Sequence, residues 1–264
     1  MKTGSLLVAG IDVGSLYTKA VILNGKGEVT SFSILPSGAA YQEAAKVSFS
    51  EALNKAGVAS DEISYMVATG YGRAIVPFAN IQVTEISCHA RGARWIFPGA
   101  HTVIDIGGQD IKAISLGEKG QVIHFVMNDK CAAGTGRFLE VMAATLGVSL
   151  EGLSELSAQP RHQVEVSSIC TVFAESEVIS LLARGGDKRD IAAAVFEAIA
   201  RRIVALVGQV GIKERVVMTG GVAKSPGMVK ALERKLNTTI LVPQQPQITG
   251  ALGAALIAAE RLSF

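Results

Sequence analysis

A pattern that occurs twice is the feature of this sequence that most constrains its fold. The two copies are "DVGSLYTKAVI" at residues 12–22 and "DIGGQDIKAIS" at residues 105–115. Each copy follows an apolar stretch and contains Asp, a β-branched residue, Gly, a small residue and, a few positions later, Lys-Ala. The repeat predicts two related halves, each opening with a strand, a tight glycine turn and a second strand.

The turn in each copy has the chemistry of a phosphate site. An Asp at the end of a strand, followed by Gly and a small residue, brings backbone N–H groups together in the arrangement that holds a phosphate. A single copy is more often an ordinary β-hairpin, but two copies with Asp and Lys at matching places favour a nucleotide site. The chain contains no P-loop pattern GxxxxGK[ST], and no GxGxxG fingerprint follows either strand.

A third glycine site is found near the end of the chain. The segment "RVVMTGGVAKSPGMVKALERKL" predicts a short strand, a turn at Gly220 and Gly221, and a helix with Ser225 as N-cap and Pro226 at its first position. The following segment, "ITGALGAALIAAERL", predicts a helix rich in Gly and Ala that allows close backbone approach. Each of these features alone is typical of an ordinary strand–helix connection.

In this order the motifs resemble the nucleotide fold shared by actin, sugar kinases and heat-shock chaperone ATPases, in which two similar domains close over ATP. The resemblance implies an α/β protein with the actin-like ATPase fold, built of two duplicated α/β domains with a nucleotide cleft between them. It places the first domain at residues 1–98 and the second at residues 99–248. It also implies that a helix of residues 249–264 packs back on the first domain.

The same resemblance assigns residues that contact the nucleotide. In the first phosphate motif they are Asp12, Gly14, Ser15, Leu16, Tyr17, Thr18 and Lys19; in the second, Asp105, Gly107, Gly108 and Gln109; in the adenosine motif and around the last helix, Gly220, Gly221, Val222, Gln247, Gly250 and Ala251. One departure is visible, because Leu16 and Tyr17 stand where small residues are commoner. Backbone binding is expected to survive this change, while Tyr17 is expected to narrow the site.

Phosphoryl chemistry gives these residues their expected roles. Successive amides of residues 14–18 would bind phosphate oxygens, and Lys19 would add positive charge. Asp12 and Asp105 would hold Mg²⁺ directly or through its waters, because Mg²⁺ keeps several waters and takes few carboxylates. Gln109 would orient the attacking water, so Asp105 and Gln109 are the expected catalytic residues.

The cysteines form no disulfide framework. They are Cys88, Cys131 and Cys170. An isolated cysteine is usually a small buried hydrophobic residue, and this is the expectation for the first of them. The other two are expected at the starts of two helices, one beginning within residues 132–136 and one capped by Thr171, where partial positive charge favours a thiolate. Lys130 would add to that charge. The chain lacks zinc-ligand spacing, and two cysteines per chain make a four-cysteine site only across a symmetric dimer.

A closer resemblance rests on eight segments. They are "GIDVGS…TKAVI", "ATGYGR", "TEISCHARGA", "VIDIGGQDIKAI", "MNDKCAAGTGRFLEVMA", "CTVFAESEVISLLARG", "VMTGGVA" and "GALGAALIA". Together they resemble the activator component of 2-hydroxyacyl-CoA dehydratases, within the BadF/BadG/BcrA/BcrD-type ATPase family that also serves benzoyl-CoA reductases. The resemblance spans nearly the whole chain, and its most specific parts are "NDKCAAGTGRFLE" and "CTVFAESE".

This family resemblance implies a particular activity. It implies a homodimer with one 4Fe–4S cluster on its two-fold axis, held by Cys131 and Cys170 of both subunits. It further implies that ATP hydrolysis, with Mg²⁺ and ATP/ADP as cofactors, drives a low-potential electron from ferredoxin or flavodoxin to a 2-hydroxyacyl-CoA dehydratase or a related acyl-CoA reductase. The dehydratase then performs the chemistry on the acyl-CoA, under anaerobic conditions.

The composition narrows the other possibilities. The formal charge of +2 is nearly balanced, which argues against a nucleic-acid or membrane-surface partner. No apolar run reaches a membrane-spanning length, and the N-terminal segment indicates a first strand, so a cytoplasmic protein is expected.

Two alternatives stay open from the residues alone. One is a small-molecule kinase of the same superfamily, for which only "TGYGR" at residues 69–73 offers a polar substrate pocket. The other is a non-catalytic actin-like or chaperone-like protein that binds partners according to its nucleotide. Neither alternative explains two cysteines in matched settings.

Overall fold

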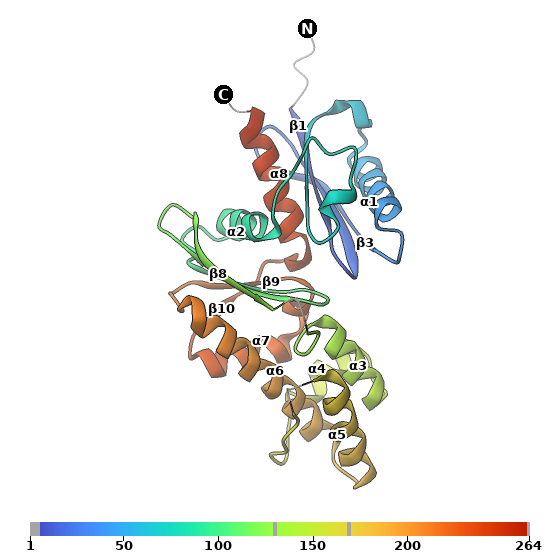
Figure 1. Ribbon diagram of the computed structural model, residues 1–264, viewed down its shortest axis with the longest axis vertical. Coiled ribbons are helices and arrows are strands. Elements are labelled where there is room, and N and C mark those ends of the chain that lie inside the picture. The colour runs from blue at the N-terminus through green and yellow to red at the C-terminus, as the bar shows by residue number, and fades with distance from the viewer. Residues whose placement is uncertain (1–5, 129–130, 168–169, 263–264) are drawn as a thin grey trace. The chain divides into compact units, whose positions relative to one another are not determined.

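The computed structural model of the chain describes residues 6–128, 131–167 and 170–262. These residues form two units (Figure 1). The first contains residues 1–100, 116–123 and 243–264, and the second contains residues 101–115 and 124–242. Each unit has a five-stranded sheet that combines antiparallel and parallel pairs.

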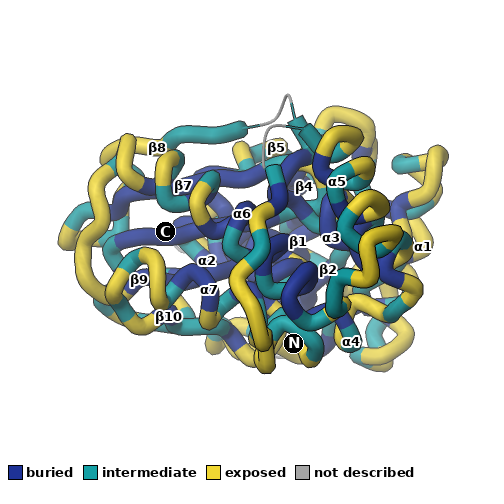
Figure 2. The backbone as a smooth tube through the Cα atoms, turned by 90° about the horizontal axis from the view of Figure 1, so that it is seen from below, coloured by how far each residue is buried: buried dark blue, intermediate teal, exposed yellow. Residues whose placement is uncertain are grey.

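The sheet of the first unit runs in the order β3-β2-β1-β4-β5. Its strands are β1 (Leu7–Val13), β2 (Tyr17–Leu23), β3 (Val29–Pro36), β4 (Ile63–Thr69) and β5 (Ile81–Gln82). β1 pairs antiparallel with β2 and parallel with β4. Every residue of β1 is buried, as Figure 2 shows for the central strands, because both faces of the sheet are covered.

Helices cover the two faces of this sheet. They are α1 (Tyr41–Ala56), α2 (Glu85–Ile96) and α8 (Thr249–Leu262), with short 3-10 turns η1 (Ser60–Glu62), η2 (Arg73–Ile75) and η4 (Pro246–Ile248). α1 packs on β1, β2 and β3, whereas α8 packs on β1, β2 and β4 and is itself covered by α2 (Figure 1). Two apolar cores result, one on each side of the sheet. This three-layer arrangement is typical of α/β units.

The contact of α8 with its neighbours depends on glycine. A Cβ at Gly10 would overlap the Ala251 carbonyl oxygen, and a Cβ at Gly253 would overlap the Cys88 carbonyl oxygen. These glycines therefore let α8 approach β1 on one side and α2 on the other at backbone distance.

Replacing one of these glycines is expected to destabilise the protein. Because the methyl group in Gly253→Ala meets backbone that cannot move alone, we expect the free energy of unfolding to fall by about 1–3 kcal/mol. Gly208→Ala is the matched control: it also lies within a helix but has no atom within 4 Å of its added Cβ. That change should raise stability by up to about 1 kcal/mol through helix propensity. Equal melting temperatures for the two variants would contradict this packing account.

The second unit repeats the strand arrangement in the order β10-β9-β6-β7-β8. Its strands are β6 (Thr102–Ile106), β7 (Ile111–Leu116), β8 (Val122–Asn128), β9 (Val216–Thr219) and β10 (Ile240–Leu241). β6 pairs antiparallel with β7 and parallel with β9, just as β1 pairs with β2 and β4 in the first unit. The sequence repeat is therefore also a repeat of strand topology.

The helices of the second unit enclose one large core. They are α3 (Gly136–Leu146), α4 (Leu150–Leu156), α5 (Thr171–Ala183), α6 (Lys188–Val210) and α7 (Pro226–Leu236), with the 3-10 turn η3 (Gly221–Lys224). Phe138, Met142 and Phe196 are among the largest fully buried side chains of this core. The N-cap prediction for α7 is confirmed: Ser225 accepts a hydrogen bond from the Met228 amide, and Pro226 is the first helical residue. Among the described residues, every helix is too short or too polar to cross a lipid bilayer.

Candidate functional site

The first phosphate turn joins β1 to β2. The Gly14 amide donates to the Tyr17 carbonyl at 3.1 Å and closes the turn, so it is not available to a ligand. The expectation that all amides of residues 14–18 face a phosphate is therefore wrong for Gly14. The amides of Ser15 and Leu16 donate to no other group among the described residues. They are the donors that this turn offers to an anion.

The second phosphate turn, between β6 and β7, closes in the same way. The Gly107 amide donates to the Asp110 carbonyl at 3.0 Å. The amides of Gly108 and Gln109 have no acceptor within the part of the chain that the structure describes. Each copy of the repeat thus presents two adjacent N–H groups on a two-residue turn, directly after a strand that carries an Asp. Paired amides of this kind form an anion-binding concavity.

The second turn also receives the start of α3. The Gly136 amide donates to the Gly107 carbonyl at 2.9 Å, and the Arg137 amide donates to the Gly108 carbonyl at 2.9 Å. The first amides of a helix have no partner within it, so these bonds satisfy them. The turn is therefore connected by backbone hydrogen bonds to the helix that follows Cys131.

An ion pair stands at the end of each repeat strand, part-buried in the first unit and buried in the second. The Lys19 Nζ lies 3.0 Å from the Asp12 Oδ2, and the Lys112 Nζ lies 3.1 Å from the Asp105 Oδ2. Lys112 also pairs with the Asp110 Oδ1 at 2.8 Å and is only 2% exposed. Charge-assisted bonds of this kind hold a carboxylate in one orientation. Lys112 was not among the predicted site residues, although it occupies the same position in the second copy of the repeat as Lys19 in the first.

A Thr-Gly pair completes each copy. β4 ends at Thr69, opposite Asp12 in the parallel pair, and Gly70 follows with φ +87°. A Cβ at Gly70 would overlap the Asp12 Oδ1. Both the left-handed backbone and the close approach therefore require glycine. The segment "ATGYGR" contains this pair, but the pair was not assigned to the carboxylate site from the sequence.

The later copy of the Thr-Gly pair stands beside the second carboxylate. β9 ends at Thr219, which donates from Oγ1 to the Asp105 Oδ1 at 2.9 Å. Gly220 follows with φ +86°, and a Cβ there would overlap the Ile106 carbonyl oxygen. Asp105 thus has a lysine on one oxygen and a threonine on the other.

The remaining predicted site residues are spread over both units. Thr18 is buried and its hydroxyl bonds to Ser37 at 2.9 Å, while Tyr17 is exposed. Gly221 and Val222 begin η3. The others occupy the entry to α8: Gln247 is in η4, and Gly250 and Ala251 are buried in the first turn of α8. Gly250 lies beside Asp12, whereas Ala251 lies against Gly10 of β1.

The helix after Cys131 begins within the predicted range 132–136 and Cys170 stands at a helix start, but the two cysteines do not have matched settings. α3 begins at Gly136, five residues after Cys131, because Gly134 has φ +89° and Thr135 is extended. A helix dipole acts within its first turn, so it does not reach Cys131. Cys170 is itself the N-cap of α5 and Thr171 is its first residue, so the capping assignment was also wrong. Lys130 lies outside the described residues.

The cysteine segments nevertheless converge on neighbouring helices. α3 and α5 pack against each other (Figure 1). Cys131 and Cys170 are free thiols of intermediate exposure, and Cys131 packs against the core of the second unit. Cys88 is fully buried, as expected, and burial raises its pKa to about 12. No group of three or more His, Cys, Asp or Glu side chains in residues 6–128, 131–167 and 170–262 is arranged to hold a metal ion.

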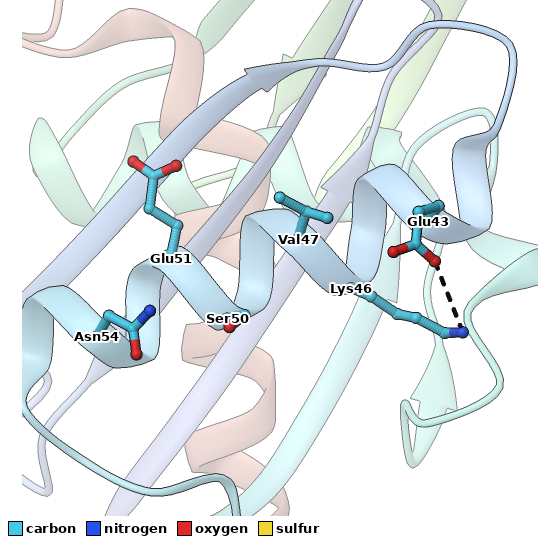
Figure 3. A pocket seen from close by; sticks show the side chains of 6 residues that line it. All are labelled: Glu43, Lys46, Val47, Ser50, Glu51 and Asn54. Carbon is cyan, nitrogen blue, oxygen red and sulfur yellow. Dashed lines mark ion pairs between the residues drawn. The ribbon is translucent and has the colours of Figure 1, made fainter.

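A surface hollow on α1 has no part in this site. Figure 3 shows that its lining comes from one helix, with a Lys46–Glu43 ion pair at 3.8 Å. The lining residues are Glu43, Lys46, Val47, Ser50, Glu51 and Asn54. Their spacing is that of a single helical stripe, and both members of the ion pair are more than half exposed. The hollow is a solvated helix face.

Known proteins share this architecture and much of the sequence. A ROK family glucokinase from Streptomyces griseus, with a TM-score of 0.60 at 16% identity over 96% of this chain and 99% of its own, shows the fold alone. The fold is thus that of the actin-like ATPases and sugar kinases, as predicted. An activator of 2-hydroxyisocaproyl-CoA dehydratase from Clostridium difficile, solved with bound ADPNP, gives a TM-score of 0.93 at 43% identity, over 98% of this chain and 96% of that one.

Sequence comparison agrees. The (R)-2-hydroxyglutaryl-CoA dehydratase activating ATPase of Acidaminococcus fermentans is 48% identical over 255 residues, which is 96% of this chain and 97% of the relative. The pattern of the BadF/BadG/BcrA/BcrD ATPase family matches residues 9–258. The chain belongs to the BadF/BadG/BcrA/BcrD ATPase family.

Proposed function

We propose that this chain hydrolyses ATP and uses the reaction to deliver a low-potential electron to a 2-hydroxyacyl-CoA dehydratase or a related acyl-CoA reductase. The proposed ATP hydrolysis rests on one observation: the two turns close in the same way. Each turn has two adjacent amides that lack acceptors among the described residues. The proposed delivery of an electron to a dehydratase is supported by the close relatives, which are named as a dehydratase activator and a dehydratase activating ATPase.

The residues of each turn have distinct tasks in this proposal. The paired amides bind phosphate oxygens, where fixed donors stabilise the charge that develops during transfer. Asp12 and Asp105, each held by its lysine through Oδ2, would hold Mg²⁺ directly or through its waters. Gln109 orients the attacking water from the second turn.

The electron carrier in this proposal is one 4Fe–4S cluster shared by two copies of the chain. The donor set fits such a group: Cys131 and Cys170 are accessible free thiols leading into helices that pack together. Two thiols are half of the four thiolates that such a cluster takes, so a second copy must supply the rest. When bound, the cluster accepts and passes on one electron. Ferredoxin or flavodoxin is the proposed electron donor.

Coupling between hydrolysis and electron transfer is proposed to run through the second turn. The carbonyls of Gly107 and Gly108 accept the first two amides of α3. A change at the turn when the γ-phosphate leaves therefore alters the position of α3 relative to α5. A nucleotide shifts such an equilibrium only through contacts that differ between the two states, and the γ-phosphate provides that difference.

A kinase activity is not favoured. The ROK glucokinase shares the fold at 16% identity, whereas the relatives above 40% identity with known names are dehydratase activators. Anaerobic purification followed by iron analysis and an ultraviolet–visible spectrum tests the proposal. Four irons per dimer, a spectrum bleached by dithionite, and ATPase activity without added substrate are expected. A phosphorylated small molecule and an iron-free protein would contradict it.

Removing the side chain of Gln109 is expected to stop hydrolysis without preventing binding. Because the amides of the turn remain, Gln109→Ala should keep its nucleotide affinity, while kcat falls by about a hundredfold or more. Gln209→Ala, on the exposed face of α6, is the matched control and should behave as wild type. Unchanged turnover of Gln109→Ala, measured by phosphate release, would remove this role.

A further inference from the structure

A buried histidine stands beside the first carboxylate and has no part in the function described so far. His89 lies on α2 and is only 5% exposed. A histidine that is taken out of water needs polar partners. The groups around its ring therefore indicate what it does.

The ring nitrogen of His89 and the carboxylate of Asp12 converge on Gly250. The place where a Cβ of residue 250 would stand lies 2.8 Å from the His89 Nε2 and 3.1 Å from the Asp12 Oδ2. The same Asp12 oxygen accepts the Lys19 ammonium at 3.0 Å. Imidazole, carboxylate and ammonium thus gather at the start of α8, where the lysine is only partly buried, and only glycine leaves room for them.

The twin site in the second unit shows which contact the first carboxylate lacks. Asp105 is held by Lys112 on Oδ2 and by the Thr219 hydroxyl on Oδ1. The counterpart of that threonine is Thr69, whose buried hydroxyl makes no hydrogen bond to any oxygen or nitrogen of the described residues. It faces the Cys88 thiol instead. Asp12 therefore has its lysine but not the threonine that its twin has.

We propose that His89 is a positioning residue for Asp12, donating from Nε2 to the Oδ2 that also accepts Lys19, so that Asp12 gains a second contact, as Asp105 does from Thr219. The proposal rests on the proposed nucleotide function, because the role of Asp12 there is to bind Mg²⁺ at the first phosphate turn. His89 acts through Asp12 and does not touch the nucleotide. Its loss therefore weakens the magnesium-dependent part of nucleotide binding.

Substitution of His89 by glutamine or by asparagine shows which of its two ring nitrogens makes the contact. A glutamine at position 89 places its amide group near the former Nε2, whereas an asparagine reaches only as far as Nδ1. His89→Gln is expected to keep the magnesium dependence of wild type. His89→Asn should weaken Mg²⁺–ADP binding about tenfold, as a lost hydrogen bond to a charged group predicts, with little change in binding of ADP in EDTA. His124→Gln, on the exposed strand β8, is the control.

The measurement is the shift in melting temperature with ADP, with and without Mg²⁺, on the full anaerobically purified chain, followed by a double-mutant cycle with Asp12→Asn. If His89 acts through Asp12, the asparagine change costs nothing further in the Asp12→Asn background. Equal magnesium dependence for wild type and His89→Asn, or equal losses for His89→Gln and His89→Asn, would overturn the inference. If His89→Asn does not fold, the glutamine variant decides: folded protein that has lost the magnesium dependence contradicts the role of Nε2.

The wild-type protein distinguishes a failure of the proposed nucleotide binding from a failure of the role of His89. Wild-type protein that binds no nucleotide at all overturns the proposed function and this inference together. Wild-type protein that binds Mg²⁺–ADP, with an unaffected His89→Asn variant, overturns the inference alone.

Discussion

Cys170→Ala protein, purified without oxygen, is expected to contain no iron–sulfur cluster and to lose the dimer that depends on it. In the proposed shared cluster each copy supplies two thiolates, so one substitution per chain removes two of the four ligands. Iron should fall from about four per dimer to background, and the visible absorbance should disappear. Iron analysis and light scattering during anaerobic gel filtration measure both effects.

The position of Cys170 makes this a clean experiment. Cys170 occupies the N-cap of α5, but its side chain caps no amide there, so alanine removes a thiol without removing a helix cap. Cys88→Ala is the matched control, because its thiol is fully buried in the first unit and is kept protonated by burial. It should retain iron and colour. A brown, dimeric Cys170→Ala protein would show that the ligands were assigned wrongly.

The repeated core could be predicted from the sequence because its signals are local. Asp, Gly and Lys recur at fixed spacing, and the structure gives both copies the same turn closure and the same ion pair. The cap at Ser225 was predictable for the same reason, since a cap is read within four residues. Of the threonine–glycine pairs, only Gly220 of the later pair was among the predicted site residues. Their meaning depends on a parallel strand that places Thr69 opposite Asp12, which no local pattern contains.

The start of α3 could be predicted only to within residues 132–136, because its exact position depends on contacts distant in sequence. The segment after Cys131 is rich in small residues, and its composition allows a helix start anywhere from residue 132. The start is fixed at Gly136 because the Gly136 and Arg137 amides find acceptors on Gly107 and Gly108, nearly thirty residues earlier. His89 was missed for a similar reason, because its relation to Asp12 arises only when α8 brings Gly250 between them.

The same long-range bonds make α3 the element through which a phosphate turn reaches the cysteine segments. Two backbone hydrogen bonds from one helix to one turn leave little freedom for independent movement. Within the second unit, the bonds from Gly136 and Arg137 connect the second turn to α3. We therefore expect ATP hydrolysis to affect the electron carrier through the second turn. Loss of these hydrogen bonds should uncouple electron transfer from hydrolysis.

Gly136→Pro is expected to separate ATP hydrolysis from electron transfer. Proline suits the first position of a helix, and Thr135 before it is already extended (φ −98°, ψ 178°), so α3 should persist. The ring removes the amide that donates to the Gly107 carbonyl and occupies its place. We expect iron content and nucleotide binding to be retained, while ATP-dependent electron transfer to the dehydratase falls at least about tenfold, as loss of a coupling energy of this order predicts.

Gly136→Ala is the matched control for this change, because it keeps the amide and places a Cβ 3.3 Å from the Gly107 carbonyl oxygen, a contact that a small shift relieves. It should transfer electrons at close to the wild-type rate. Both variants are compared by dehydratase activation per ATP hydrolysed, with circular dichroism to verify the helix. If the proline variant activates the dehydratase as efficiently as the alanine variant, hydrolysis is not transmitted through the bond between Gly136 and Gly107, and the coupling must follow another route.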